Sequence, residues 1–182
     1  MNYANIKYRD IADGEGVRTT LFVSGCSHHC ENCFQPETWS SSYGQEFTTD
    51  IADEVLATLD DFFVDGLTFL GGEPMEPENQ HGLLQLAKRA KALHPEKSIW
   101  CYTGDVYEDL VDAASPRHTE ETDELLGLID VLVDGPYIDS LHDITLRFRG
   151  SSNQRVIDMN ETRKTGEVVL WKDEEVYSTH SM

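Results

Sequence analysis

The chain has 182 residues, 39% of them hydrophobic, which is enough for one ordinary core, so we expect a single domain over residues 1–182. Its 34 acidic and 14 basic residues give a formal charge of −20, which repels phosphate backbones and anionic lipid, so we expect no nucleic-acid or membrane partner. No apolar run approaches the roughly 20 residues that span a bilayer, and we expect a cytoplasmic protein.

The sequence predicts four buried strands from short apolar runs at residues 17–23, 67–70, 99–102 and 131–133. The connections between them carry helical signals. Apolar residues at helical spacing predict a helix over 51–62, with Thr48, Thr49 or Asp50 as its N-cap. A second apolar stripe predicts a helix from about residue 79 to the stop at Pro95. The third connection, 105–128, is predicted to hold two short helices.

Strands that alternate with helices in this way form parallel βαβ units, so the sequence predicts an α/β fold. In such a fold the loops after the carboxyl ends of the strands meet at one rim, where ligands usually bind. We expect four such loops around one site, beginning near Cys26, Gly71, Thr103 and Asp134.

Three cysteines follow the first predicted strand, with the spacing Cys26-x3-Cys30-x2-Cys33. Three thiolates at this spacing can bind three corners of a four-iron cluster and leave the fourth iron open to a substrate. The alternative is structural zinc, with a histidine as fourth ligand from among His28, His29, His81 and His94. Zinc sites typically use two separated cysteine pairs, and this chain has one Cys-x2-Cys pair. The spacing therefore favours an iron–sulfur cluster, with His28 and His29 as loop groups.

The segment Gly71-Gly72-Glu73-Pro74 follows the second predicted strand. Two glycines after a strand commonly mark a tight turn. They also let a ligand approach the backbone closely, and a glutamate carboxylate can accept hydrogen bonds from a ligand ammonium group. Because the segment is expected beside the cysteines, the second interpretation gains weight.

These two features together resemble the radical S-adenosylmethionine superfamily, in which the same cysteine spacing precedes a Gly-Gly-Glu-Pro strand end. Further segments resemble one family within it, the activating enzymes of anaerobic ribonucleoside-triphosphate reductase. They include residues 13–18, 21–39, 100–104, 131–135 and 149–154, and the resemblance extends to about residue 157. It implies a partial (β/α) barrel of parallel strands, and it assigns no role to an extension over residues 158–182.

The resemblance implies a [4Fe-4S] cluster held by Cys26, Cys30 and Cys33, with S-adenosylmethionine bound to the open iron. Glu73 is expected to orient the methionine amino group, with the backbone of Gly71 and Gly72 close to the cofactor.

Three further residues are candidates for cofactor contacts. Thr103 and Asp134 can reach ribose or carboxylate groups, although turn chemistry at a strand end accounts for them almost as well. The superfamily often has an aromatic residue just before the third cysteine, where this chain has Asn32. The neighbouring aromatic residue is Phe34, which we take as the candidate for an adenine contact.

The implied reaction is reductive cleavage of S-adenosylmethionine to a 5′-deoxyadenosyl radical, which abstracts hydrogen from a glycine of the reductase large subunit. Such an enzyme needs a low-potential electron donor such as flavodoxin. The alternatives are an activator of another glycyl-radical enzyme such as pyruvate formate-lyase, a small-molecule radical enzyme of the same superfamily such as a deazapurine synthase, and a zinc-stabilised interaction module without catalysis.

Two features of the last third of the chain complete the predictions. Arg147, Arg149 and Arg155 are conspicuous in an acidic chain and are expected to form local salt bridges or to meet a partner. Residues 167–171 are predicted to form a last strand.

Overall fold

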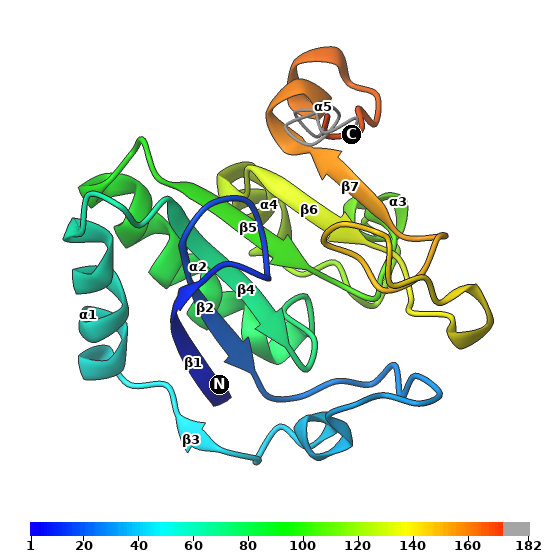
Figure 1. The fold of residues 1–182 in the computed structure, drawn as a ribbon, viewed down its shortest axis with the longest axis horizontal. Coiled ribbons are helices and arrows are strands. Elements are labelled where there is room, and N and C mark those ends of the chain that lie inside the picture. The colour runs from blue at the N-terminus through cyan, green and yellow to red at the C-terminus, as the bar shows by residue number, and fades with distance from the viewer. Residues whose placement is uncertain (173–182) are drawn as a thin grey trace, which may run out of the picture.

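The computed structural model describes residues 1–172, which form a seven-stranded sheet in the order β3-β1-β2-β4-β5-β6-β7. Its four central strands are mutually parallel, and they are β2 (Arg18–Val23), β4 (Gly66–Gly71), β5 (Ser98–Tyr102) and β6 (Val131–Asp134). The arrows of β2, β4 and β5 point toward one edge of the sheet in Figure 1. The α/β class and the four strands expected from apolar runs are therefore confirmed.

Antiparallel strands flank this parallel centre on both sides. β1 (Asn2–Asp10) pairs with β2, the short β3 (Gln45–Glu46) pairs with β1, and β7 (Arg155–Asp158) pairs with β6. The sequence analysis missed all three. β1 alternates apolar and polar residues from Ala4 to Arg9, the pattern of a strand with one solvent-facing side, and it was missed because only continuous apolar runs were taken as strands. β3 has only 2 residues, and β7 begins and ends with a charged residue, Arg155 and Asp158, so neither contains an apolar run.

The predicted helices are present with shifted ends. α1 (Thr49–Ala57) begins after Thr48, whose hydroxyl accepts the Ile51 N–H at 3.4 Å, and a 3-10 turn follows it. The helix ends before residue 62, so Phe62 does not belong to the buried stripe and is 93% exposed. α2 (Pro77–Leu93) starts earlier than predicted because Pro77 suits its first turn. The third connection holds α3 (Tyr107–Val111) and α4 (Thr122–Leu128), as expected.

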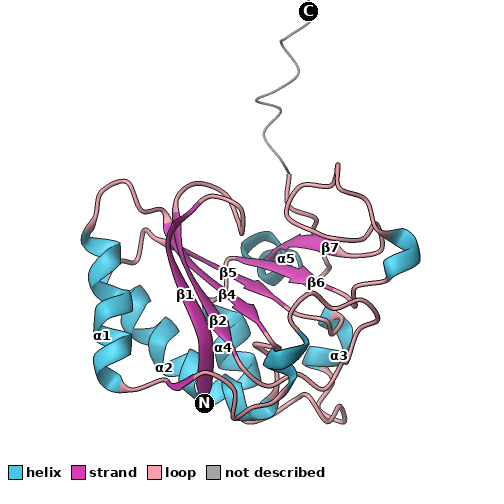
Figure 2. Ribbon diagram, turned by 60° about the horizontal axis from the view of Figure 1, so that its bottom comes forward, coloured by secondary structure: helices cyan, strands magenta, loops and turns pink. Residues whose placement is uncertain are grey.

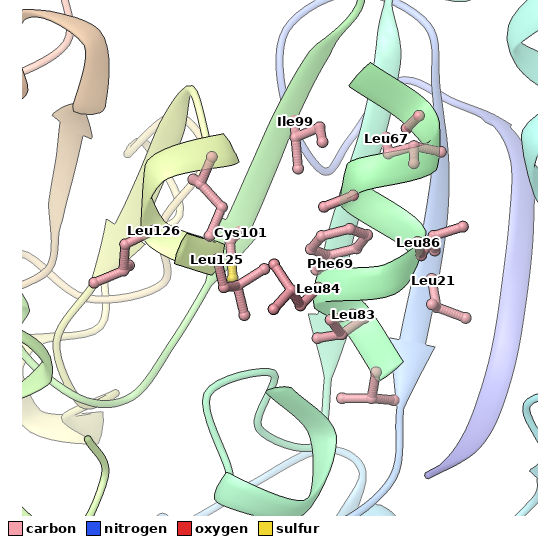
Figure 3. Packing of buried hydrophobic residues seen from close by; sticks show 14 of the residues in the cluster. Leu21, Leu67, Phe69, Leu83, Leu84, Leu86, Ile99, Cys101, Leu125 and Leu126 are labelled. Carbon is pink, nitrogen blue, oxygen red and sulfur yellow. The ribbon is translucent and has the colours of Figure 1, made fainter. Parts of the chain in front are cut away.

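One face of the central sheet is covered by helices, which together with it form the main core. α1 and α2 lie side by side along the sheet in Figure 2. Figure 3 shows buried leucines of α2 facing apolar side chains of the central strands. These strand side chains are Leu21, Leu67, Phe69 and Ile99. Each such side chain contributes about 1.5–3 kcal/mol when it leaves water. The strands whose ends carry the rim loops are therefore held in place by the packed core between the sheet and the helices.

The opposite face carries polar and aromatic side chains. Thr20, Thr68 and Trp100 lie level with one another in the parallel register and are buried. The loop 11–17 crosses this face, where the Thr68 hydroxyl donates to the Asp13 carbonyl at 2.8 Å. Farther along the sheet, a second apolar cluster joins Trp100, Val131 and Val133 to the rings of Phe148 and Trp171. The two faces of the sheet thus differ sharply in chemistry.

The strand predicted at residues 167–171 is reduced to a short antiparallel pairing with β7, in which the Asp158 N–H donates to the Val169 carbonyl and the Trp171 N–H to the Val156 carbonyl. A helix, α5 (Met159–Thr165), lies between β7 and this segment, and Gly166 ends it with a φ of +75°. After this turn the chain meets β7 only briefly, with a single bridge between Leu170 and Ile157. Because β7 is itself short, no longer ladder forms there.

No helix within residues 1–172 is long and apolar enough to cross a membrane. The domain expected from the sequence extended to residue 182, and residues 173–182 of it lie outside the described part of the chain.

Candidate functional site

The cysteine loop leaves the sheet at the carboxyl end of β2. Gly25 has a φ of +95°, a conformation that suits glycine. The chain returns through a 3-10 helix, Pro36–Trp39. The Gly25 N–H donates to the Thr38 carbonyl at 2.8 Å, and the Cys26 N–H donates to the Trp39 carbonyl at 3.1 Å. Both ends of the loop are therefore held at the sheet edge, and Cys26, Cys30 and Cys33 lie between them as half-buried thiols.

The three thiols are not gathered at one point in this structure. Within residues 1–172, no three cysteine sulfurs lie within 4.8 Å of one another, as ligands of one tetrahedral zinc would. Ligands of a four-iron cluster bind different irons and so stand farther apart. Burial raises the pKa of the Cys26 thiol to about 11. Because cysteine binds metals as a thiolate, any metal bound at Cys26 would displace a proton.

Gly71 and Gly72 bring the end of β4 against the start of the cysteine loop. The Gly72 N–H donates to the Val23 carbonyl, and the Glu73 N–H donates to the Gly25 carbonyl, each at 2.8 Å. A Cβ on Gly71 would lie 2.5 Å from the Val23 nitrogen, and one on Gly72 would lie 2.6 Å from the Gly25 oxygen. Backbone packing alone therefore requires glycine at both positions, and their predicted proximity to a cofactor stays a prediction.

The buried Glu73 carboxylate joins three rim loops at one point. Its Oε1 accepts the Met75 N–H at 2.8 Å, and its Oε2 accepts the Gly104 N–H at 2.8 Å. The same Oε2 lies 3.0 Å from Nε2 of His28, which in turn lies 3.4 Å from Oδ2 of Asp105. The loops after β2, β4 and β5 are thus connected through side chains as well as through the sheet.

His28 is positively charged in this network. Hydrogen bonds with Asp105 and Glu73 raise the pKa of His28 to about 10, against the effect of burial. Burial acts to raise the pKa of Asp105, but the hydrogen bonds and charges of His28 and Arg117 outweigh it and lower that pKa. The ligand atoms of His28, Glu73 and Asp105 lie within 4.8 Å of one another. The three residues therefore form a network in which one histidine bridges two carboxylates.

Thr103 and Asp134 are buried at the ends of β5 and β6 and have partners within the chain. The Thr103 hydroxyl accepts the Asp105 N–H at 3.1 Å, as in a turn. Asp134 accepts the Tyr107 N–H at 2.8 Å and Nε of Arg155 at 2.9 Å. Arg155 thus forms a local salt bridge, one of the two roles expected for it. Contacts of Thr103 or Asp134 with a cofactor stay a prediction.

Phe34 follows the third cysteine and is 89% exposed, so its ring is open to a ligand or to a partner. Its adenine contact stays a prediction. Of the histidines considered as zinc ligands, His29 stacks on Trp39 with ring centroids 4.5 Å apart. His81 pairs with the carboxylate of Glu121, and His94 pairs with that of Asp60, while His28 lies in the network described above. Within the described chain, none of them joins the cysteines in a closed metal site.

Sequence reasoning did not single out three charged residues beside His28 and Glu73, which are Asp105, Glu76 and Arg117. Arg117 forms ion pairs with the other two, at 2.6 Å to Glu76 and 3.0 Å to Asp105. Asp105 could have been found, because it lies in a predicted rim loop directly after Thr103 and Gly104. Arg117 had no such signal. It comes from the connection between α3 and α4, and no spacing in the sequence places that connection against the cysteine loop.

Comparison of the sequence with known proteins identifies the family of this chain. Residues 12–157 match a family model described as a 4Fe-4S single cluster domain, a span that contains the three cysteines. The chain is 42% identical over 156 residues to an anaerobic ribonucleoside-triphosphate reductase-activating protein of Vibrio cholerae serotype O1, covering 85% of this chain and 96% of that protein.

Two further relatives carry the same description. The protein of Escherichia coli strain K12 is 39% identical over 158 residues, which cover 86% of this chain and 97% of that protein. The protein of Enterobacteria phage T4 is 38% identical over 156 residues, which cover 86% of this chain and 93% of that protein. At these identities and over this length, the chain belongs to the family of anaerobic ribonucleoside-triphosphate reductase-activating proteins.

Proposed function

We propose that this chain is a radical S-adenosylmethionine enzyme that generates a glycyl radical on anaerobic ribonucleoside-triphosphate reductase. Membership of the activating-protein family supports the reaction and its substrate protein. The structural observation that carries the proposal is the joining of the cysteine loop to the Gly-Gly-Glu-Pro end of β4, through the two 2.8 Å backbone hydrogen bonds of Gly72 and Glu73. These bonds bring a cluster-binding loop and a carboxylate to one edge of the sheet.

In this proposal Cys26, Cys30 and Cys33 bind a [4Fe-4S] cluster, and S-adenosylmethionine occupies the remaining iron. A cluster held by these cysteines would supply one electron for cleavage of S-adenosylmethionine to methionine and a 5′-deoxyadenosyl radical, which would take a hydrogen atom from a glycine of the reductase and become 5′-deoxyadenosine. The protein positions and shields these groups.

Glu73 is the residue we assign to the methionine amino group. Its carboxylate already has partners within the chain, but an ionised carboxylate offers about four lone-pair positions, and Oε1 has one hydrogen bond, from Met75. The side chain is fixed on both oxygens, so a ligand ammonium group would meet an acceptor that is already oriented. Thr103, Asp134 and Phe34 remain secondary candidates for the rest of the cofactor.

We also propose that the sheet is the wall of a partial (β/α) barrel within a single domain. The four parallel strands support this, as does the segregation of helices to one face and of polar side chains to the other. An incomplete barrel leaves an entrance for the glycine-bearing segment of another protein. The reaction further needs a low-potential donor such as flavodoxin and reduced thiols, which fits a cytoplasmic setting.

The first experiment is anaerobic purification followed by iron, sulfide and zinc analysis. About four irons and four sulfides per chain are expected from the cluster type. Stoichiometric zinc without iron would instead establish a zinc-stabilised module and end this proposal.

The second experiment tests the substrate protein. The reduced enzyme is mixed with S-adenosylmethionine and the anaerobic reductase, and electron paramagnetic resonance is used to look for a glycine-centred radical on the reductase. Pyruvate formate-lyase serves as the control protein. A radical on the control and none on the reductase would show that the assigned partner is wrong.

A further inference from the structure

We propose that Arg117 is a positioning residue, which clamps the cysteine loop to the rim and thereby fixes where the open iron meets S-adenosylmethionine. The inference rests on the proposed function for its chemical consequence. Its structural part rests on contacts made by the guanidinium group of Arg117 within this chain.

The guanidinium group joins three rim loops. Nη2 donates to the Ser27 hydroxyl at 2.7 Å, in the loop after β2. Nη1 lies 2.6 Å from Oε2 of Glu76, after β4, and Nε lies 3.0 Å from Oδ2 of Asp105, after β5. The side chain is only 13% exposed. Each of the three guanidinium nitrogens therefore contacts a different loop, and all three contacts lie around one planar group.

The contact with the cysteine loop is reinforced by Glu76. The Ser27 N–H and the Ser27 hydroxyl both lie 3.2 Å from Oε2 of Glu76, the oxygen that Arg117 also binds. Ser27 is in the three-residue link between Cys26 and Cys30. Holding this link restricts the separation and orientation of two of the three assigned cluster ligands.

The backbone of Arg117 is itself anchored, unlike that of a typical surface arginine. Its carbonyl accepts a hydrogen bond from Nε2 of Gln80 at 2.8 Å, and the same nitrogen donates to the Met75 carbonyl at 2.8 Å. Oε1 of the buried Gln80 accepts from the hydroxyls of Thr119 and Thr122. The start of α2, the Gly-Gly-Glu-Pro turn and the connection that carries Arg117 are therefore bound together.

The positive charge of Arg117 also compensates the negative charges of Glu76 and Asp105. Glu76 and Asp105 are 17% and 12% exposed, and carboxylates this far removed from water need a cation nearby. A lysine can supply the charge at this position, but its single ammonium group on a flexible stem cannot reproduce three contacts in one plane. The comparison of lysine with glutamine at position 117 therefore separates charge from positioning.

The test uses the full chain with Arg117→Gln and Arg117→Lys, and with Arg89→Gln as the matched control. Arg89 pairs with Asp53 across α2 and α1, outside the rim. Two properties are measured. The first is amide hydrogen exchange of Cys26 and Ser27, whose N–H groups donate to the Trp39 carbonyl and to Glu76, in the metal-free and the cluster-loaded chain. The second is the separate effect on KM for S-adenosylmethionine and on kcat for its cleavage.

We expect both Arg117 variants to exchange the amides of Cys26 and Ser27 at least fivefold faster than the unmodified chain, and to raise KM at least fivefold with a smaller change in kcat. Arg89→Gln is expected to match the unmodified chain in both measurements. An Arg117→Lys variant with the exchange and KM of the unmodified chain would overturn the clamp, because charge alone would then suffice. If the unmodified chain cleaves no S-adenosylmethionine, the proposed function fails, and exchange in the metal-free chain still decides the clamp.

Discussion

An arginine lies at each end of the parallel strands, and the two differ in their partners. Arg18 begins β2 and is 1% exposed. It donates to the Thr68 and Ser98 hydroxyls at 2.7 and 3.0 Å and to the carbonyls of Leu67, Ser98 and Glu15 at 2.6–3.0 Å. Its guanidinium also lies over the Trp100 ring, 5.5 Å from the centroid. At the rim, Arg117 is bound by the carboxylates of Glu76 and Asp105.

This difference separates a structural end from a chemical end of the sheet. At the amino end, Arg18 satisfies carbonyls of neighbouring strands without a carboxylate among its hydrogen-bond partners in residues 1–172, and burial lowers the pKa of Arg18 to about 10. At the rim, charges of both signs hold loops that carry reactive groups. Substitutions at the amino end should therefore reduce stability, and those at the rim should reduce activity.

The largest effect is expected from Cys30→Ala. Two remaining thiolates cannot hold the same three irons, so the intact cluster and all cleavage of S-adenosylmethionine should be lost. The metal-free chain should keep its stability within about 0.5 kcal/mol, as for a surface substitution. Iron content, 5′-deoxyadenosine formation and urea denaturation measure these quantities. Retained cleavage would contradict the ligand assignment.

Arg18→Met should have the largest effect on stability. It leaves buried carbonyl and hydroxyl groups of β4 and β5 without their donor, and we expect a loss of about 3–5 kcal/mol in the free energy of unfolding. Urea denaturation of the metal-free chain measures it, with Arg89→Met as the control for loss of an exposed arginine. A loss below 1 kcal/mol would remove the contrast between the two ends.

Glu73→Gln tests whether the rim is also structural. Both oxygens of Glu73 accept backbone N–H groups, so a glutamine must place an amide NH2 against one of them. We expect a loss of about 1–3 kcal/mol in the free energy of unfolding and a higher KM for S-adenosylmethionine. Unchanged KM in a folded variant would argue against Glu73 as the acceptor for the methionine amino group.

The smallest effect concerns Asp13, in the loop over the polar face. Burial and the adjacent Asp10 raise the pKa of Asp13 to about 6, from 3.8 for an unperturbed group. Between these values the folded chain retains a proton that the unfolded chain has lost, so this group's stabilisation is lost as pH rises from about 4 to 6. Asp13→Asn should therefore gain stability relative to the unmodified chain by about 1–3 kcal/mol between pH 4 and pH 7. Denaturation at the two pH values checks it, and a constant difference would exclude this account.

The central architecture could be predicted because its signals are local. Each buried strand is a short apolar run, and the two longest helices begin with a recognisable signal, the Thr48 cap of α1 and the proline in the first turn of α2. Once four parallel strands are expected, the convergence of Cys26, Glu73, Thr103 and Asp134 at one rim follows from topology. Short strands at the edges, such as β7, had no comparable signal.

The rest of the site depends on contacts between residues distant in the chain. Arg117 and Ser27 are separated by 90 positions, and His28 and Glu73 meet because three loops fold over one point. Such pairs leave no spacing to recognise. The sequence likewise pointed to a ligand role for Gly71 and Gly72, whereas the structure also shows a steric reason, the close approach of β2.

The pairing of Gly25 and Cys26 with Thr38 and Trp39 has a thermodynamic consequence. Ordering a backbone costs about 1–2 kcal/mol per residue, and the ends of the cysteine loop are already ordered when the chain folds. Cluster assembly therefore does not have to supply that entropy, and less of its binding free energy is consumed in arranging the ligands. The ends of the cysteine loop are therefore ordered before the cluster binds. Removal of the cluster by a chelator should leave a folded chain that can bind a cluster again.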